Sequence, residues 1–198
     1  MSKGSGEAHA MQRLAEVRLA QGHREEAQQL LRRALPLARW SVVASHLLQR
    51  IFGTLIIAAP DAATARAEVD RAEASMGETD RCRFCEVMLA VPAAIACADF
   101  GDLDEAHRHL RIAEASAVRW EGSAWQAAAC EARAHVARAE GDEQEFAAQL
   151  RRAAQLFHAA GHHGDAARCE LKHSAGAATS ARTTALSSAG STETTAGV

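Results

Sequence analysis

Four tight turns recur at nearly constant spacing, and this repeat constrains the fold more than any other feature of the sequence. The turns centre on Gly22, Pro60, Gly101 and Gly141, which lie 38, 41 and 40 residues apart. A fixed period of this length is typical of architectures in which one supersecondary unit is stacked several times. We therefore expect about four similar structural units, each close to 40 residues long.

Apolar residues occupy the same places after every turn. All four units carry one at 5, 9, 12 and 16 residues past the turn residue, and these steps of 4, 3 and 4 trace one face of an α-helix. The sixteen positions are Ala27, Leu31, Ala34 and Ala38; Ala65, Val69, Ala72 and Met76; Ala106, Leu110, Ala113 and Ala117; and Phe146, Leu150, Ala153 and Phe157. Small residues stand seven positions before the turns, as a close helix crossing requires: Ala15, Gly53, Ala94 and Ala134. Each unit is therefore predicted to be a helical hairpin.

The same pattern places the helix boundaries. Helices are predicted near 8–21, 24–39, 41–58, 62–76, 80–100, 102–118, 123–140 and 142–160, with a short capping helix at 163–172. Asp61, Asp102 and Asp142 stand where second helices begin, so their carboxylates can cap free N–H groups there. Pro36 and Pro92 fall inside two of the helices, where a kink or a break is expected.

Composition favours an all-α fold. The sequence is 48% hydrophobic but only 4% aromatic and has no tyrosine, so it lacks the aromatic residues that strands prefer. The net charge of −3 argues against a nucleic-acid binder, which usually carries a basic excess. The most apolar window, 42–59, contains His46, Gln49 and Arg50 and is interpreted as a buried helix, not a membrane span. Five cysteines without a signal peptide indicate reduced thiols and a cytoplasmic location.

Three regions are expected. Residues 1–6 are predicted to be disordered, 7–172 to form the repeat domain, and 173–198 to be a disordered tail. Of the 25 residues from Ser174 to Val198, 21 are Ser, Thr, Ala or Gly, and such a segment buries too little surface to offset its ordering entropy.

The turn-anchored pattern resembles the tetratricopeptide repeat. That family places small residues where its helices cross and alanines at the +5 and +12 positions, filled here by Ala27/Ala34, Ala65/Ala72 and Ala106/Ala113, whereas Phe146 departs from the pattern. The present units are longer than the family's period of about 34 residues. They also lack most of the first-helix aromatics, with only Phe52 aromatic at its position.

The longer period resembles the helical arrays of large bacterial LuxR-type ATPase regulators, over about residues 8–172. The segments 127–142 and 150–168 are similar to the region that precedes the DNA-binding domain in those proteins. That family carries a P-loop and a helix-turn-helix, but no G-x-x-x-x-G-K-[ST] occurs here and the Ser/Thr/Ala-rich tail follows residue 172. The resemblance therefore implies only the array, which serves the family in binding partners or effectors.

Several groups of residues can be interpreted either as functional or as purely structural. The motif Cys82-x-x-Cys85 has two functional interpretations, half of a zinc site or a redox pair. The alternative is that both cysteines are small apolar residues at the start of a helix. His107 and His109 follow on the next helix, but residues two apart on a helix point in different directions and make a poor joint ligand set.

Groups of histidines, arginines and tryptophans likewise have a functional and a structural interpretation. Three histidines lie at one turn, and they form either a cluster that binds a metal or senses pH or a set of solvated turn residues: His158, His162 and His163. Arginines recur on the second helices: Arg32, Arg33, Arg71, Arg111, Arg151 and Arg152. They form either a docking site for an acidic peptide or for phosphate groups, or a solvated outer face. Trp120 and Trp125 either line a pocket or fill the gap between neighbouring repeats.

These observations predict an all-α, right-handed solenoid of four tetratricopeptide-like hairpins with a capping helix. No catalytic, cofactor-binding or metal-binding residue is assigned, because no G-x-S-x-G, H-E-x-x-H or Gly-rich phosphate loop occurs. The expected function is that of a non-catalytic protein-protein interaction or signal-sensing module, derived from a bacterial transcriptional regulator as the resemblance implies. A protein or peptide is expected to bind in a concave groove lined mainly by the first helices, without contact to nucleic acid or membrane. Two alternatives stay open: a small-molecule effector site near Trp120 and Trp125, and thiol-redox or metal chemistry at Cys82 and Cys85.

Overall fold

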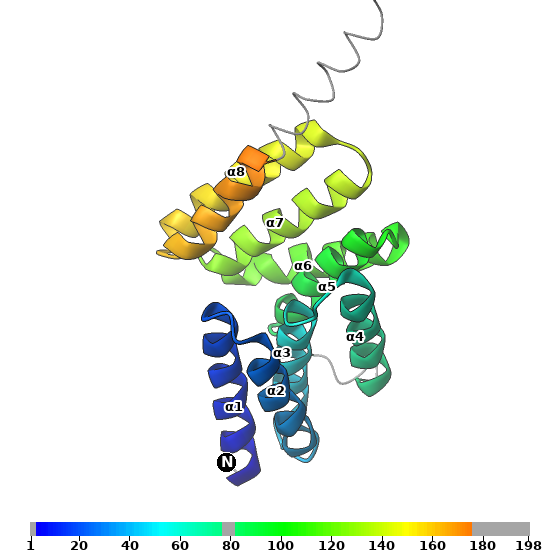
Figure 1. Cartoon of the computed structure of the whole chain (residues 1–198), viewed down its shortest axis with the longest axis vertical. Helices are drawn as coiled ribbons and strands as arrows, with labels where there is room; N and C mark the ends of the chain where they lie inside the picture. Colours follow the sequence, from blue (N-terminus) through cyan, green and yellow to red (C-terminus); the bar gives the residue numbers. More distant parts are fainter. Residues whose placement is uncertain (1–2, 77–81, 176–198) are drawn as a thin grey trace, which may run out of the picture.

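The computed structural model describes residues 3–76 and 82–175, and all regular secondary structure in these ranges is helical (Figure 1). The helices in chain order are α1 (Lys3–Ala20), α2 (Arg24–Arg39), α3 (Ala44–Ile57), α4 (Ala62–Ser75), α5 (Glu86–Phe100), α6 (Leu103–Ala117), the 3-10 helix η2 (Val118–Trp120), α7 (Ala124–Ala139) and α8 (Glu143–Ala159). A further helix, here termed the C-terminal helix, covers 163–175. The prediction of an all-α chain is confirmed for the described residues.

Every predicted hairpin turn is formed. Gly22, Gly101 and Gly141 have φ of 83°, 92° and 84°, a left-handed conformation that glycine adopts without steric cost. The predicted caps are present as well, because Asp61 accepts a hydrogen bond from the Thr64 N–H at 2.7 Å and Asp142 one from Glu145 at 2.9 Å. Asp102 makes the same contact with Glu105 at 3.4 Å.

Replacing Asp142 with alanine should lower the free energy of unfolding by about 1 kcal/mol, because the first N–H groups of α8 lose their acceptor. Urea unfolding of the two proteins measures the difference. Asp142→Asn is the control, because asparagine caps helices about as well as aspartate. An Asn variant as unstable as the Ala variant would contradict a capping role.

The core consists of the positions that recur in the sequence. All sixteen apolar positions after the turns are buried, and so are the four small residues before them. At Gly53 an added Cβ would lie 2.0 Å from the backbone oxygen of Met88, so α3 and α5 approach each other closely there. The predicted requirement for a small residue is therefore met between two successive hairpins.

Successive hairpins pack against one another. The helices of each pair α1/α2, α3/α4, α5/α6 and α7/α8 contact each other, and α3 also contacts α1 and α2 while α5 contacts α3, α4 and α7. The C-terminal helix covers the last hairpin, where its Ala166 and Cys169 join Phe146 and Phe157 in one buried cluster. Its position agrees with the capping helix predicted at 163–172.

The structure differs from the predicted boundaries at several ends. Helix α1 begins at Lys3, so residues 3–6, expected to be disordered, are helical. Burial explains this, because Ser5 is 1% exposed and its hydroxyl lies 2.5 Å from that of Ser41. Residues 41–43 and 82–85 form turns ahead of α3 and α5, which start later than predicted. In the tail, residues 173–175 belong to the C-terminal helix, while 176–198, like 1–2 and 77–81, lie outside the described residues.

The two internal prolines do not end their helices. Pro36 lies in the last turn of α2, which continues to Arg39, and Pro92 lies within α5, which continues to Phe100. Of the two predicted outcomes, a kink or a break, the break does not occur at either proline. Among the described helices, none combines the length and the apolar character that crossing a bilayer requires, and the window 42–59 contains the largely buried α3.

Candidate functional site: a groove along the first helices

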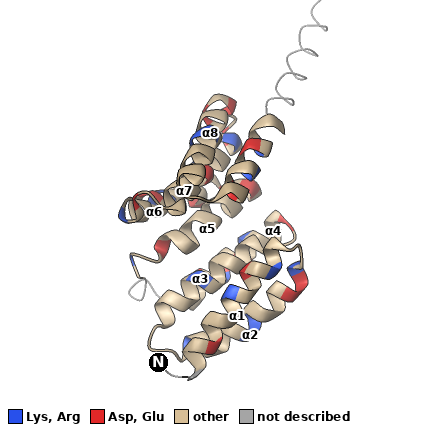
Figure 2. Ribbon diagram, turned by 90° about the vertical axis from the view of Figure 1, so that its left-hand side faces the viewer, with Lys and Arg blue, Asp and Glu red and all other residues tan. Residues whose placement is uncertain are grey.

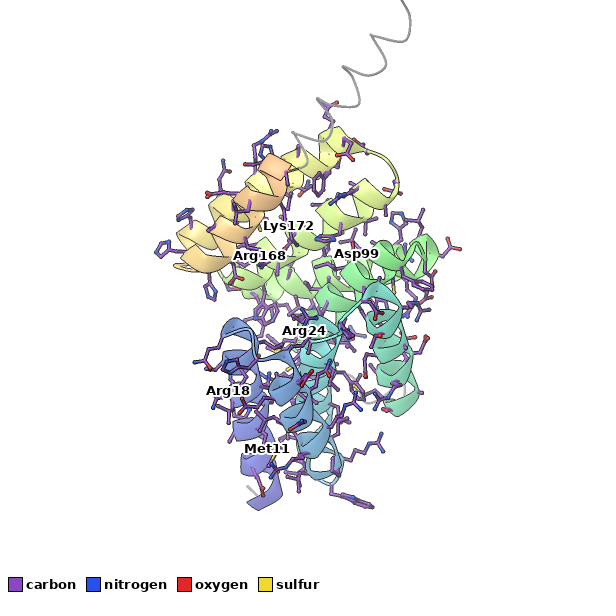
Figure 3. All side chains as sticks on the ribbon, viewed as in Figure 1. Met11, Arg18, Arg24, Asp99, Arg168 and Lys172 are labelled. Carbon is purple, nitrogen blue, oxygen red and sulfur yellow. The ribbon has the colours of Figure 1, made fainter. Side chains whose placement is uncertain are left out.

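One groove of about 1170 Å³ runs across the molecule. Its walls come mainly from the first helix of each hairpin, namely α1, α3, α5 and α7, and from the C-terminal helix. Second helices contribute less: Arg24 from α2, Ala62 and Ala65 from α4, and Phe157 from α8. Figure 3 shows Arg24, Asp99, Arg168 and Lys172 around the middle of the molecule, where the groove lies.

The groove residues recur in register with the turns. Six positions before the turn residues stand Glu16, Thr54, Ile95 and His135, and all four line the groove. A second set of groove residues stands nine or ten positions before the turn residues: Arg13, Arg50, Val91 and Glu131. The spacing of three or four residues places both sets on one face of each first helix, and this face borders the groove although Thr54, Val91 and Glu131 are themselves buried. This signal was present in the sequence but was missed, because the chemistry at these positions varies from unit to unit.

The middle of the groove is apolar. Ile57 of α3 is 63% exposed, and Met88 and Ile95 of α5 and Trp125 of α7 are half-buried beside it. Figure 2 shows residues of both charge signs along the ribbon, but α5 is almost uncharged, since it carries only Glu86 and Asp99. The floor therefore offers apolar surface to a ligand.

Charged side chains stand at the α1–α3 end. Arg13 contacts Glu16 at 2.8 Å, and Arg50 lies 3.9 Å from the same carboxylate. Burial, followed by the nearby charge of Arg13, lowers the pKa of Arg50 below its ordinary value. Within the described part of the chain, the buried Nε of Arg50 has no hydrogen-bond acceptor. This nitrogen is shielded from solvent, so Arg50 reaches the groove through the exposed 17% of its side chain.

An extended polar network forms the opposite end. Glu131, only 3% exposed, is bound by Arg168 and by Lys172, whose Nζ lies 2.9 Å from Oε1. Lys172 also reaches His135 Nε2 at 2.9 Å, and His135 Nδ1 contacts Asp99 at 2.8 Å. Burial alone would raise the pKa of Glu131, but the two cations outweigh it and hold that pKa below its ordinary value. The network therefore joins α5, α7 and the C-terminal helix through a buried carboxylate.

Trp120 and Trp125 both line the groove, and both also pack against the hydrophobic core. The indole N–H of Trp120 donates to the carbonyl oxygen of Phe84 at 2.8 Å, and the two rings meet edge to face. The pocket-wall and gap-filling interpretations are therefore compatible.

The six recurring arginines are exposed and none of them lines the groove, as for a solvated outer face: Arg32, Arg33, Arg71, Arg111, Arg151 and Arg152. Arg71 is bound by Glu68 at 2.6 Å. The turn histidines are exposed too, with His158 and His163 3.1 Å apart and His162 3.3 Å from Asp165.

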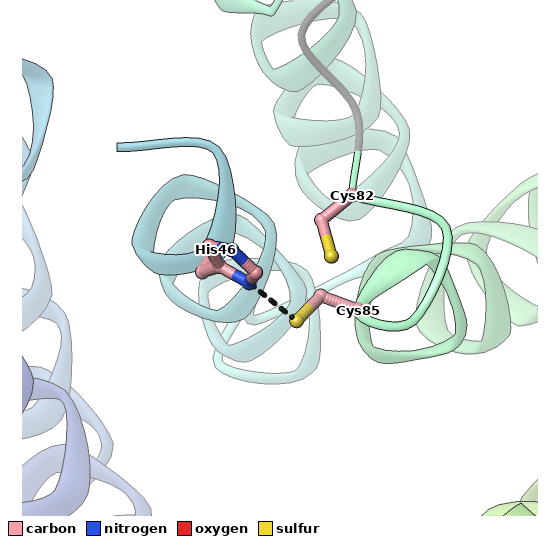
Figure 4. Close-up of side chains that lie close together, drawn as sticks. All are labelled: His46, Cys82 and Cys85. Atoms are coloured by element: carbon pink, nitrogen blue, oxygen red, sulfur yellow. Dashed lines mark hydrogen bonds between the residues drawn. The ribbon is translucent and has the colours of Figure 1, made fainter. Parts of the chain in front are cut away.

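The cysteine pair has a partner that sequence reasoning missed. His46 at the start of α3 places Nδ1 3.1 Å from the Cys85 sulfur, and these atoms and the Cys82 sulfur all lie within 4.8 Å of one another (Figure 4). Burial, together with the neighbouring Cys82, raises the pKa of Cys85 to about 11. A redox thiol needs the opposite shift, because the thiolate is the attacking species, and a metal that binds this sulfur must displace its proton.

His107 and His109 do not join the cysteines. His107 contacts Glu140 at 2.8 Å, while His109 is buried near Glu73 and Glu105. The guanidinium of Arg108 binds both of these carboxylates, so a cation is already present in that cluster.

Comparison of the chain with protein-family models, with curated proteins and with solved structures finds no match. The resemblance to tetratricopeptide and LuxR-type arrays therefore rests on the turn spacing and on the residues at the recurring positions.

Proposed function

We propose that the protein is a non-catalytic, tetratricopeptide-like module that binds a segment of a partner protein in its groove. The observation that carries the proposal is the continuity of the groove over the first helices of all four hairpins. Stacked hairpins in a right-handed solenoid would produce such a surface, because equivalent faces of successive repeats line up along one side.

The size of the groove favours a peptide over a small molecule. Small-molecule pockets typically enclose about 300–1000 Å³ and bury most of the ligand. The groove, at about 1170 Å³, is larger and extends from α1 to the C-terminal helix. Helices and extended peptides bind in elongated grooves of this kind, with apolar side chains as anchors.

The chemistry of the groove indicates an amphipathic segment. Ile57, Met88 and Ile95 supply the apolar surface for its anchors. At one end, the positive charge of Arg50 at the groove wall favours a carbonyl or carboxylate oxygen of the ligand. Cations and anions alternate among the charged residues of both ends, so we expect recognition by mixed polar contacts and not by bulk charge.

The proposed lineage follows from the resemblance. An array of this period in LuxR-type regulators serves binding, and the sequence carries neither a P-loop nor the motifs of the catalytic classes considered above. We therefore infer an interaction module of the bacterial cytoplasm that makes no direct contact with DNA.

A displayed library of random peptides selected against the purified protein tests this function. We expect selected peptides rich in apolar residues, and Ile95→Asp should weaken their binding at least about tenfold, because a carboxylate would replace an anchor contact. Val42→Asp is the matched control, since Val42 is 88% exposed and does not line the groove.

Two results would contradict the proposal. One is a set of selected peptides that Ile95→Asp and Val42→Asp affect equally, which would place their site elsewhere. The other is a library that yields no binder although a small molecule quenches Trp120 and Trp125 fluorescence, which would favour the effector-binding alternative.

A further inference from the structure

Two cysteines and a histidine from different hairpins converge beside α5. Cys82 and Cys85 lie in the turn that precedes α5, and His46 lies in the first turn of α3. The donor atoms face one another, as Figure 4 shows, with His46 Nδ1 3.1 Å from Cys85 Sγ and all three atoms within 4.8 Å of each other. We propose that His46, Cys82 and Cys85 bind a zinc ion that links the α3/α4 hairpin to the α5/α6 hairpin.

The geometry is close to that of a zinc site. Zn–S bonds of about 2.3 Å and Zn–N bonds of about 2.0 Å hold the donors of a tetrahedral site roughly 3.5–3.8 Å apart. The His46–Cys85 separation of 3.1 Å is slightly shorter than this, and no pair of donors is more than 4.8 Å apart, so small side-chain rotations bring the three donors into place. Among the described residues three donors meet here, and a water molecule would fill the fourth position.

The backbone around the cysteines is already fixed. The Cys85 N–H donates to the carbonyl oxygen of Cys82 at 2.9 Å, which closes a tight turn and brings the two sulfurs to one side. Gln49, which is fully buried, spans the gap from α3. With its amide oriented to suit both groups, it donates to the Cys82 carbonyl and accepts from the Cys82 N–H, each at 3.3 Å. Such support around the ligands reduces the reorganisation that metal binding requires.

The donor set selects the metal. Two thiolates and an imidazole are the ligands that zinc prefers, whereas calcium and magnesium prefer oxygen. Binding releases one proton from each thiol, so Zn²⁺, two thiolates and a neutral imidazole carry no net charge. A neutral complex suits a place where both cysteines are half-buried.

Zinc titration of the reduced full-length chain, with a chromophoric chelator as competitor, tests the site. We expect one zinc per chain. His46→Ala, Cys82→Ser and Cys85→Ser should each weaken binding more than about 100-fold, because even the loss of a supporting contact costs about 10–100-fold. Cys130→Ser and His158→Ala are the controls, since neither residue belongs to the group of donors, and both should bind zinc as the natural chain does.

Two further readouts keep the test informative if a variant binds metal elsewhere. Cobalt in place of zinc should give thiolate-to-metal absorption that falls in Cys82→Ser and in Cys85→Ser. Zinc should also raise the unfolding temperature of the natural chain but not of His46→Ala, whose exposed side chain is not needed for folding.

Three results would overturn the proposal. They are the absence of equimolar zinc binding, equal affinity in His46→Ala and the natural chain, and oxidation of Cys82 and Cys85 to a disulfide that zinc does not slow. The last would indicate a redox pair.

Discussion

Replacing Gly53 with alanine is expected to lower the free energy of unfolding by about 3 kcal/mol, the upper end of what overpacking usually costs. The added Cβ would lie 2.0 Å from the Met88 carbonyl oxygen and 3.0 Å from its carbon, so α3 and α5 must move apart. For a folded region of this size, the melting temperature should fall by roughly 6–12 °C. Thermal and urea unfolding measure both quantities.

Gly164→Ala provides the control for the glycine change itself. Gly164 lies in the C-terminal helix, and an added Cβ there meets nothing within 4 Å. This variant should be unchanged or up to about 1 kcal/mol more stable, because alanine favours helix. If Gly53→Ala were as stable as Gly164→Ala, the close approach of α3 and α5 would be wrong. Since both helices form the groove floor, Gly53→Ala should also weaken peptide binding at temperatures where it stays folded.

The helices and the core were predictable because their signals are local. A turn residue, a capping aspartate and apolar positions at helical spacing lie within one hairpin, and Asp142, Leu150 and Ala153 behave in the structure as this pattern predicts. The early start of α1 was missed, because the contact between Ser5 and Ser41 joins residues 36 positions apart.

The clusters depend on the same kind of distant contact. His46 and Cys85 are 39 positions apart, and Lys172 and Glu131 are 41 apart. The two residues of each pair lie in different segments, and they come into contact only when the hairpins stack. The turn spacing predicted that they stack, but the side chains that meet depend on the rotation of each helix about its axis, which the repeat leaves unspecified.

Removing both cations from Glu131, as Arg168→Met with Lys172→Met, should lower the free energy of unfolding by about 2–4 kcal/mol at pH 7. The reason is that a buried carboxylate without a partner is costly, and the Glu131 side chain is only 4% exposed. Methionine keeps most of the apolar volume of both side chains, although the guanidinium of Arg168, which lies 6.0 Å from the centre of the Phe157 ring, is lost. Arg133→Met is the control, because its pair with Glu114 is largely exposed and should contribute less than about 1 kcal/mol.

The pH dependence separates lost charge pairing from lost packing. In the natural chain the pKa of Glu131 lies below its ordinary value of 4.5, so its contribution to stability is present above pH 4.5 and is lost as pH falls through the lower, folded-state pKa. In the double variant, burial without cations raises the pKa of Glu131 above 4.5, so the penalty is largest at neutral pH and is relieved on acidification. The stability difference between the two proteins should therefore shrink when urea unfolding is repeated at pH 5.

Glu131→Gln in the double variant completes the test. A neutral amide carries no buried charge, so this triple variant should recover much of the stability lost at pH 7, and its difference from the double variant should narrow at pH 5. A double variant equally destabilised at both pH values would show that packing, and not the charge of Glu131, is responsible. Because the network joins α7 to the C-terminal helix across one end of the groove, its loss should also loosen that wall and weaken peptide binding. The triple variant, which restores stability without restoring the cations, then distinguishes support of the wall from direct contact of Arg168 and Lys172 with the peptide.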